Sequence, residues 1–236
     1  MLILGLTGGI ATGKTAASEY FKVQNIPVVD ADQIARLVVE PDQPAYNLVV
    51  KHFGHMNILE SNSRRIDRKR LGDIIFGNDQ LRKQLNQCTH GFIRREAFKQ
   101  IIKHFFQFHS LIIWDVPLLF EVGLDKYLSH TLVICCDELL QLERLKQRDN
   151  IQDDQQALKR INAQINIKEK CRRARYVIDN SDTKDVLHKR LQAFVSTIQP
   201  SQLSTIAWFV ALFIPLSVVY GILRLWDLYD QWSNRQ

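Results

Sequence analysis

Short apolar runs recur along the chain and predict buried strands. Between them lie segments in which apolar residues recur every three or four positions, the spacing of a helix. Five runs are present: LILGL at 2–6, IPVVD at 26–30, LIIWD at 111–115, TLVICC at 131–136 and YVIDN at 176–180. Strands that alternate with helices imply a parallel sheet covered on both faces. We therefore expect an α/β fold around a five-stranded parallel sheet.

Helical patterns surround these strands. One follows the first strand at 13–23, and a long helical stretch fills most of the interval between the second and third strands. Within that stretch, GHMNILESNS at 54–63 has the composition of a loop. Further helical patterns lie at 138–148, 153–165 and 184–195. We expect one domain over 1–200, with a helical insertion at about 40–108.

Residues 203–223 form an uncharged apolar run, LSTIAWFVALFIPLSVVYGIL. A bilayer core requires about 20 helical residues, so this run is long enough to span a membrane. Aromatic residues lie near its ends, as they do at membrane interfaces. We expect a transmembrane helix here, followed by a short polar tail at 224–236. The alternative is a buried terminal helix of the preceding domain.

Composition adds that the chain is globular and weakly basic. Apolar residues make up 46% and charged residues 24%, which argues against disorder. The formal net charge of +6 is spread along the chain, without a basic stripe interleaved with aromatic residues. Nucleic acid is therefore not an expected partner.

A phosphate-binding motif lies between the first predicted strand and helix. Residues 8–15 match G-x-x-x-x-G-K-[ST], in which glycines let the backbone N–H groups surround phosphate oxygens. Lys14 would contact the β- and γ-phosphates, and the Thr15 hydroxyl would bind Mg²⁺. The residues expected to bind the triphosphate are Gly8, Gly9, Ile10, Ala11, Thr12, Gly13, Lys14 and Thr15. The chain has no N-K-x-D guanine motif, which argues against a GTPase.

Three aspartates follow predicted strands, where ligands bind in parallel sheets. Asp30 and Asp32 come after the second strand, and a carboxylate there can orient an acceptor hydroxyl and take its proton. For either residue the alternative is capping of the next helix. Asp115 ends the third strand, where it would hold the Mg²⁺ shell through water or accept a hydrogen bond from Thr15; the alternative is a turn-starting aspartate before Pro117.

Six motifs together resemble the dephospho-CoA kinase family. They are GLTGGIATGKT, VVDADQIAR, WDVPLLFE, LKQRD, RINAQ and VIDNS, in the family's order and spacing over residues 1 to about 196. The apolar run near the end is similar to that of eukaryotic proteins with a dephospho-CoA kinase domain. The resemblance implies a P-loop kinase similar to nucleoside monophosphate kinases. It also implies a helical insertion that binds CoA and a helical lid at about 149–166.

The implied activity is ATP-dependent phosphorylation of the ribose 3′-hydroxyl of dephospho-CoA, the last step of coenzyme A synthesis. Asp32 aligns with the family's proposed general base, with Asp30 beside it as a helper. Arg148 matches the arginine at which the lid begins, and Arg144, one turn earlier, is a second candidate. Gln164 and Asn180 match motifs expected near ATP.

Two further residues are expected to contact the substrate. Arg68 matches a position where the family carries an arginine suited to an anion. His90 stands where bacterial members carry His-Pro, but Gly91 replaces the proline, so an ordinary helix histidine is the alternative. In the glycine-rich loop, Ala11 occupies a position where the family often has glycine, and phosphate binding should survive this change.

Two other functions stay open. One is a membrane-anchored protein that binds nucleotide or CoA without catalysis, and the other is a kinase for a different small molecule. We expect an intracellular protein, anchored by its final helix, with the kinase domain facing the cytosol. Mitochondrial and endoplasmic reticulum membranes both stay open, as does the oligomeric state.

Overall fold

The computed structural model describes residues 1–61, 63–200 and 210. Neighbouring strands of its central sheet pair in parallel, in the order β2-β3-β1-β4-β5. The strands are β1 (Leu2–Gly8), β2 (Val28–Asp30), β3 (Leu111–Asp115), β4 (His130–Cys135) and β5 (Tyr176–Asp179). The predicted five-stranded parallel sheet is therefore confirmed.

Apolar residues on both faces of the strands explain why the sheet is a middle layer. Successive side chains of a strand point to opposite faces. On β1, Leu4 and Leu6 pack toward one face and Ile3 toward the other. Strands buried on both faces therefore appear as continuous apolar runs, the signal that the sequence carries.

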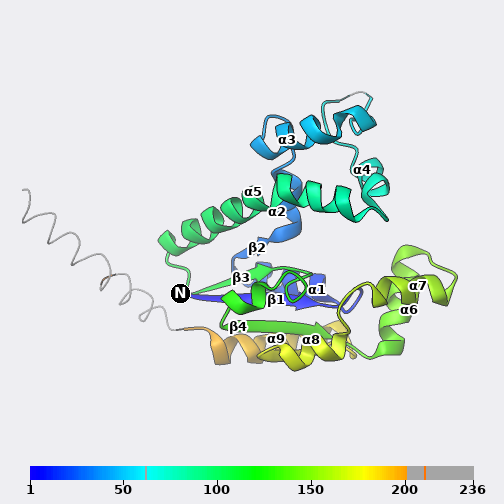
Figure 1. The fold of residues 1–236 in the computed structure, drawn as a ribbon. Helices are drawn as coiled ribbons and strands as arrows, with labels where there is room; N and C mark the ends of the chain where they lie inside the picture. Colours follow the sequence, from blue (N-terminus) through cyan, green and yellow to red (C-terminus); the bar gives the residue numbers. More distant parts are fainter. Residues whose placement is uncertain (62, 201–209, 211–236) are drawn as a thin grey trace, which may run out of the picture.

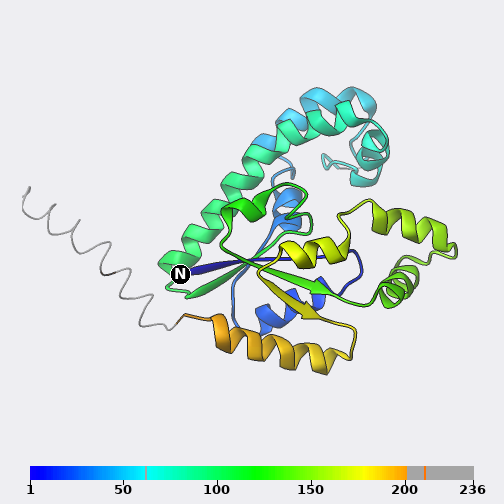
Figure 2. The same ribbon diagram turned by 60° about the horizontal axis from the view of Figure 1, so that its bottom comes forward.

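Helices cover both faces of this sheet (Figures 1 and 2). On one face lie α1 (Lys14–Val23) and α9 (Lys184–Ile198), whose apolar sides join the core around Leu4. On the other face, α2 (Ala31–Leu37) and α5 (Asp79–Phe106) pack over β2 and β3. The seven-residue α8 (Ile167–Arg173) packs against β4 and was not predicted.

The region between β2 and β3 has a core of its own. Beyond α2 it contains α3 (Pro44–Phe53), the short 3₁₀ helix η1 (Gly54–Met56) and α4 (Arg68–Ile75), which pack on α5. The buried residues of this core are Tyr46, Val49, Phe53, Ile58, Ile66, Leu71 and Cys88. Figure 1 shows these helices standing apart from the sheet layer.

A helical hairpin stands beyond the carboxyl ends of the strands (Figure 1). It consists of α6 (Glu138–Asp149) and α7 (Asp154–Asn162), joined by apolar contacts among Leu145, Ile151 and Ala157. Between β3 and β4 the chain forms a second short 3₁₀ helix, η2 (Leu124–Tyr127). The hairpin and the β3–β4 segment both border the end of β1, where the glycine-rich loop begins.

The expectation of a transmembrane helix requires correction. Within residues 1–61 and 63–200 and at Val210, no helix combines the length and the apolar character needed to cross a bilayer. The longest, α5, has 28 residues but carries charged side chains along its length, and charges are costly in hydrocarbon. The run at 203–223 lies outside the described residues except for Val210, and the tail at 224–236 lies wholly outside them.

Replacement of Phe53 by alanine should destabilise the fold, because this ring is fully buried among α3, α4 and α5. We expect a loss of about 3–5 kcal/mol in the free energy of unfolding, measured by urea denaturation. The control Phe98→Ala removes the same ring from a site that is 63% exposed, and should cost about 0.5 kcal/mol or less. Equal losses in the two variants would contradict the assignment of this core.

Candidate active site

The glycine-rich loop at 8–15 connects β1 to α1 through two positions that require glycine. Gly13 lies in the left-handed region at φ 95°, and a Cβ there would lie 2.0 Å from the Asn180 amide nitrogen. A Cβ on Gly8 would lie 2.7 Å from the Ile134 carbonyl oxygen. The glycines of the motif are therefore required by the close approach of neighbouring groups.

Three side-chain amides hold the backbone of this loop. Gln164 Oε1 accepts a hydrogen bond from the Ile10 N–H at 2.9 Å, and Gln141 Nε2 donates one to the Ile10 carbonyl at 2.7 Å. Asn180 Nδ2 donates to the Thr12 carbonyl at 2.9 Å. Gln164 and Asn180 were expected near the nucleotide, and both contact the loop itself.

Lys14 and Asp115 form an ion pair at the base of the loop. Their Nζ and Oδ1 atoms are 2.5 Å apart, because β1 and β3 pair in parallel and end side by side. Asp115 is 2% exposed, and this burial raises the pKa of its carboxyl, while the Lys14 ammonium acts in the opposite direction. Lys14 thus has a buried counter-ion on the neighbouring strand.

A cavity of about 410 Å³ lies over the loop. All loop residues except Thr12 line it, together with Asp32, Pro117, Arg144, Arg148 and Gln164. Thr12, which was also predicted to bind, is fully buried and contributes its carbonyl to Asn180. The cavity therefore combines backbone amides with basic side chains, the groups that bind phosphate.

The two aspartates after β2 have different surroundings. Asp30 Oδ1 accepts hydrogen bonds from the N–H groups of Asp32 at 2.9 Å and Gln33 at 3.0 Å, so Asp30 is the N-cap of α2. Asp32 is exposed in the first turn of α2 and lines the cavity. The capping alternative therefore holds for Asp30, which is not among the described residues lining this cavity or the next one.

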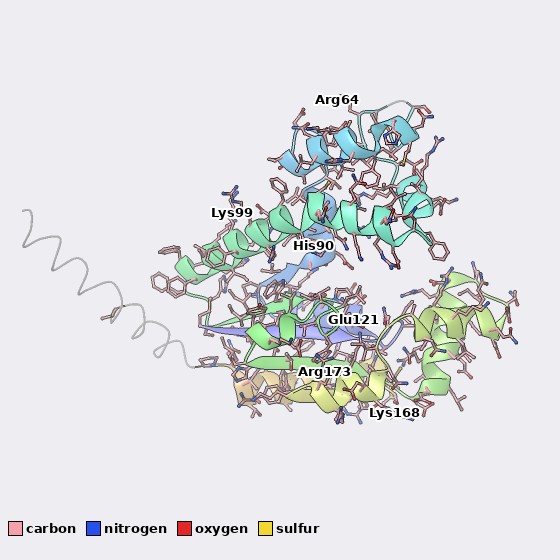
Figure 3. The ribbon with its side chains drawn as sticks, viewed as in Figure 1. Arg64, His90, Lys99, Glu121, Lys168 and Arg173 are labelled. Atoms are coloured by element: carbon pink, nitrogen blue, oxygen red, sulfur yellow. The ribbon has the colours of Figure 1, made fainter. Side chains whose placement is uncertain are left out.

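A second cavity, of about 470 Å³, lies among α2, α4 and α5 and includes Asp32 in its wall. Most of the wall is apolar. Its polar members include the two predicted substrate residues, Arg68 and His90, and also Arg36. Figure 3 shows His90 on α5. Asp32 therefore stands where the cavity over the loop and the cavity of the insertion meet.

Arg68 is already engaged in the insertion. Its guanidinium lies 3.0 Å from Glu40 Oε1 and donates to the Arg36 carbonyl at 3.3 Å. The Arg68 side chain remains 46% exposed, so it can reorient toward an anion at modest cost.

Two arginines of α6 line the cavity over the loop. Arg148 pairs with Asp149 at 2.8 Å, and this hydrogen bond holds the pKa of the Asp149 carboxyl below its usual range. Arg160 contacts the same carboxylate at 2.7 Å. Arg144, one turn earlier, donates to the Asn180 carbonyl at 2.9 Å. Arg144 is thus anchored to the backbone, whereas Arg148 is paired with an acidic side chain.

Lys170 on α8 contacts the glycine-rich loop and was not predicted from the sequence. It is fully buried, and its Nζ lies 2.7 Å from Glu121 Oε1 and donates to the carbonyls of Gly8 at 3.3 Å and Pro117 at 3.4 Å. A lysine in IKEKCRR suggests a solvated position. The available signal was its helical spacing from Ile167 and Cys171, which places all three on one face.

Known proteins are similar to this chain over most of its length. A family model described as dephospho-CoA kinase matches residues 2–185. A dephospho-CoA kinase domain-containing protein of Danio rerio is 45% identical over 192 residues, 81% of this chain and 82% of that protein. A dephospho-CoA kinase of Saccharomyces cerevisiae is 38% identical over 209 residues, 87% of this chain and 86% of that protein.

Solved structures agree with the sequence comparisons. A dephospho-CoA kinase from Campylobacter jejuni matches with a TM-score of 0.64 and 27% identity, over 84% of this chain and 96% of that one. The family model, these two relatives and this solved structure are all described as dephospho-CoA kinases or as containing that domain. The chain belongs to the dephospho-CoA kinase family.

Proposed function

We propose that this chain transfers the γ-phosphate of ATP to the ribose 3′-hydroxyl of dephospho-CoA, which yields coenzyme A. The family supports the reaction, and the position of Asp32 in the walls of both cavities is the observation that carries the mechanism. In phosphoryl transfer the attacking and leaving oxygens lie roughly in line with the phosphorus atom. Because the two cavities share Asp32, a donor in one would face an acceptor in the other.

The cavity over the loop suits the donor. Backbone N–H groups of the loop and the positive end of α1 would bind the triphosphate, with Lys14 moving from Asp115 to the phosphate oxygens. Arg148 would exchange Asp149 for the transferring group, and its planar guanidinium matches the phosphate geometry. These groups supply positive charge where negative charge accumulates in the transition state.

The cavity of the insertion suits the acceptor. Its apolar wall can cover an extended organic chain, while Arg36 and Arg68 at the wall can pair with the diphosphate of dephospho-CoA. Asp32 would orient the ribose hydroxyl and accept its proton late in the transfer. His90 lines the same wall and would serve as a hydrogen-bond partner.

Mg²⁺ fits the residues at the loop without requiring a protein cage. No group of three or more metal-ligating side chains was found among the described residues, and Mg²⁺ in such sites uses few protein ligands besides phosphates and water. Thr15 lines the cavity and would supply a direct oxygen. Asp115 is almost wholly buried and holds Lys14, so it would act through water. When bound, the ion would neutralise charge on the phosphates.

ADP release should depend on dephospho-CoA. We expect the purified full-length chain to release ADP from ATP only when this acceptor is present, as measured with a coupled assay. Tight ATP binding without turnover would support the noncatalytic alternative, and turnover with a nucleoside in place of dephospho-CoA would support a different kinase.

Asp32→Asn should lower kcat by about 10²-fold or more, because the amide cannot accept the hydroxyl proton. The Kd for ATP should change little, since the loop and Lys14 are untouched. Asp42→Asn is a matched control, because Asp42 is an exposed aspartate that lines neither cavity. Its partner is Arg64, which is labelled in Figure 3. Normal turnover by Asp32→Asn would show that this residue is not the base.

Lys14→Ala should abolish turnover and raise the Kd for ATP by about tenfold or more, because it removes a charge-assisted contact to the phosphates. It also leaves Asp115 buried without its counter-ion, so thermal unfolding is measured in parallel. Lys22→Ala, in the last turn of the same helix, is the control and should retain activity. ATP affinity unchanged in folded Lys14→Ala would contradict the role of Lys14.

A further inference from the structure

Lys170 places a buried positive charge directly against the glycine-rich loop. Its ammonium has three acceptors from two segments: Glu121 and the Pro117 carbonyl in the β3–β4 segment, and the Gly8 carbonyl at the end of β1. An ammonium has three N–H donors, so this environment satisfies all of them. A buried charge with matched partners is costly to assemble and indicates a geometry that the fold maintains.

The contact with Gly8 has a consequence on the other side of the same peptide. A peptide unit is planar, so a hydrogen bond that fixes the Gly8 carbonyl also fixes the direction of the Gly9 N–H. Gly8 and Gly9 both line the cavity over the loop. A cation on the carbonyl also polarises the peptide, and hydrogen bonds in such chains strengthen one another.

Glu121 extends the connection to the end of the α6–α7 hairpin. The same Oε1 that pairs with Lys170 accepts a hydrogen bond from the Ile165 N–H at 3.1 Å. The preceding residue, Gln164, holds the Ile10 N–H. The hairpin is therefore tied to the loop directly through Gln164 and indirectly through Glu121 and Lys170.

A second ion pair joins the same two segments without reaching the loop. Arg173 lies three residues after Lys170 on α8, and its guanidinium is 2.7 Å from Oδ2 of Asp125, which lies four residues after Glu121. Figure 3 shows Glu121 in the β3–β4 segment and Arg173 on α8. The Arg173 guanidinium packs over the Phe120 ring, 4.8 Å from its centroid. This pair attaches α8, and the lysine pair both attaches α8 and contacts Gly8.

We propose that Lys170, held by Glu121, is a positioning residue for phosphoryl transfer: it orients the Gly8–Gly9 peptide that receives the triphosphate. This inference rests on the proposed function in one respect, that the triphosphate is ATP. The test measures ATP binding and not turnover, so it can be carried out even if the native protein does not phosphorylate dephospho-CoA.

The test compares two double variants of the full-length protein. Lys170→Met with Glu121→Gln removes both charges of the lysine pair, which avoids leaving one buried charge without its partner. Arg173→Met with Asp125→Asn is the matched control. Isothermal titration gives the Kd for ATP, and thermal unfolding gives stability. We expect the lysine-pair variant to bind ATP about tenfold or more weakly, and the control to stay within about twofold of the native protein.

Equal ATP affinity in the two double variants would overturn the proposal, because Lys170 would then only attach α8. The same conclusion follows if weaker binding merely parallels lost thermal stability in both. Should the lysine-pair variant not fold, Lys170→Leu with Glu121→Gln, which also removes the N–H donors to the Gly8 carbonyl, replaces it. ATP affinity of this folded replacement within about twofold of the native value would equally overturn the proposal.

Discussion

Parallel pairing places Leu6 of β1 beside Asp115 of β3, and Asp115 beside Asp30 of β2, at one edge of the sheet. The glycine-rich loop begins two residues after Leu6, so Lys14 reaches Asp115 from the adjacent strand end. Asp30 caps α2 and thereby fixes the start of the helix that carries Asp32. The register of the strands therefore brings Lys14, with its partner Asp115, and the Asp32 carboxylate to the same cavity.

Three cations near the two cavities each form an ion pair with a carboxylate of the protein. Lys14 is paired with Asp115, Arg148 with Asp149 and Arg68 with Glu40. Each cation lines a cavity and has a carboxylate that satisfies it. Under the proposed function, phosphates would replace these carboxylates, and the free energy of binding would be the difference between the old and the new ion pairs. The exposed pairs are inexpensive to open, and the buried Lys14–Asp115 pair is the costly one.

Sequence patterns predicted the sheet and most helices because buried strands and amphipathic helices have distinct spacings. The loop motif predicted the cavity over the loop, because few other residues fit at Gly8 and Gly13 and the motif is therefore recognisable in the sequence. The sequence could not predict that Asp30 caps α2 and Asp32 lines the cavity. Either aspartate can cap a helix, and the residue at which α2 begins determines which one does. α8 was missed since its most buried side chain is Lys170, which a pattern of apolar and polar residues treats as exposed.

Asp32 lies on α2. Ile34 of α2 and Val38, its C-cap, pack in one cluster with Ala97 and Ile101 of α5, the long helix of the insertion. The same cluster includes Val29 of β2 and Ile112 of β3, and Asp30 at the end of β2 accepts a hydrogen bond from the Asp32 N–H. Asp32 therefore lies at the junction between the sheet and the insertion. If the outer helices of the insertion moved about this junction, the far wall of the second cavity would shift while the carboxylate stayed beside the glycine-rich loop.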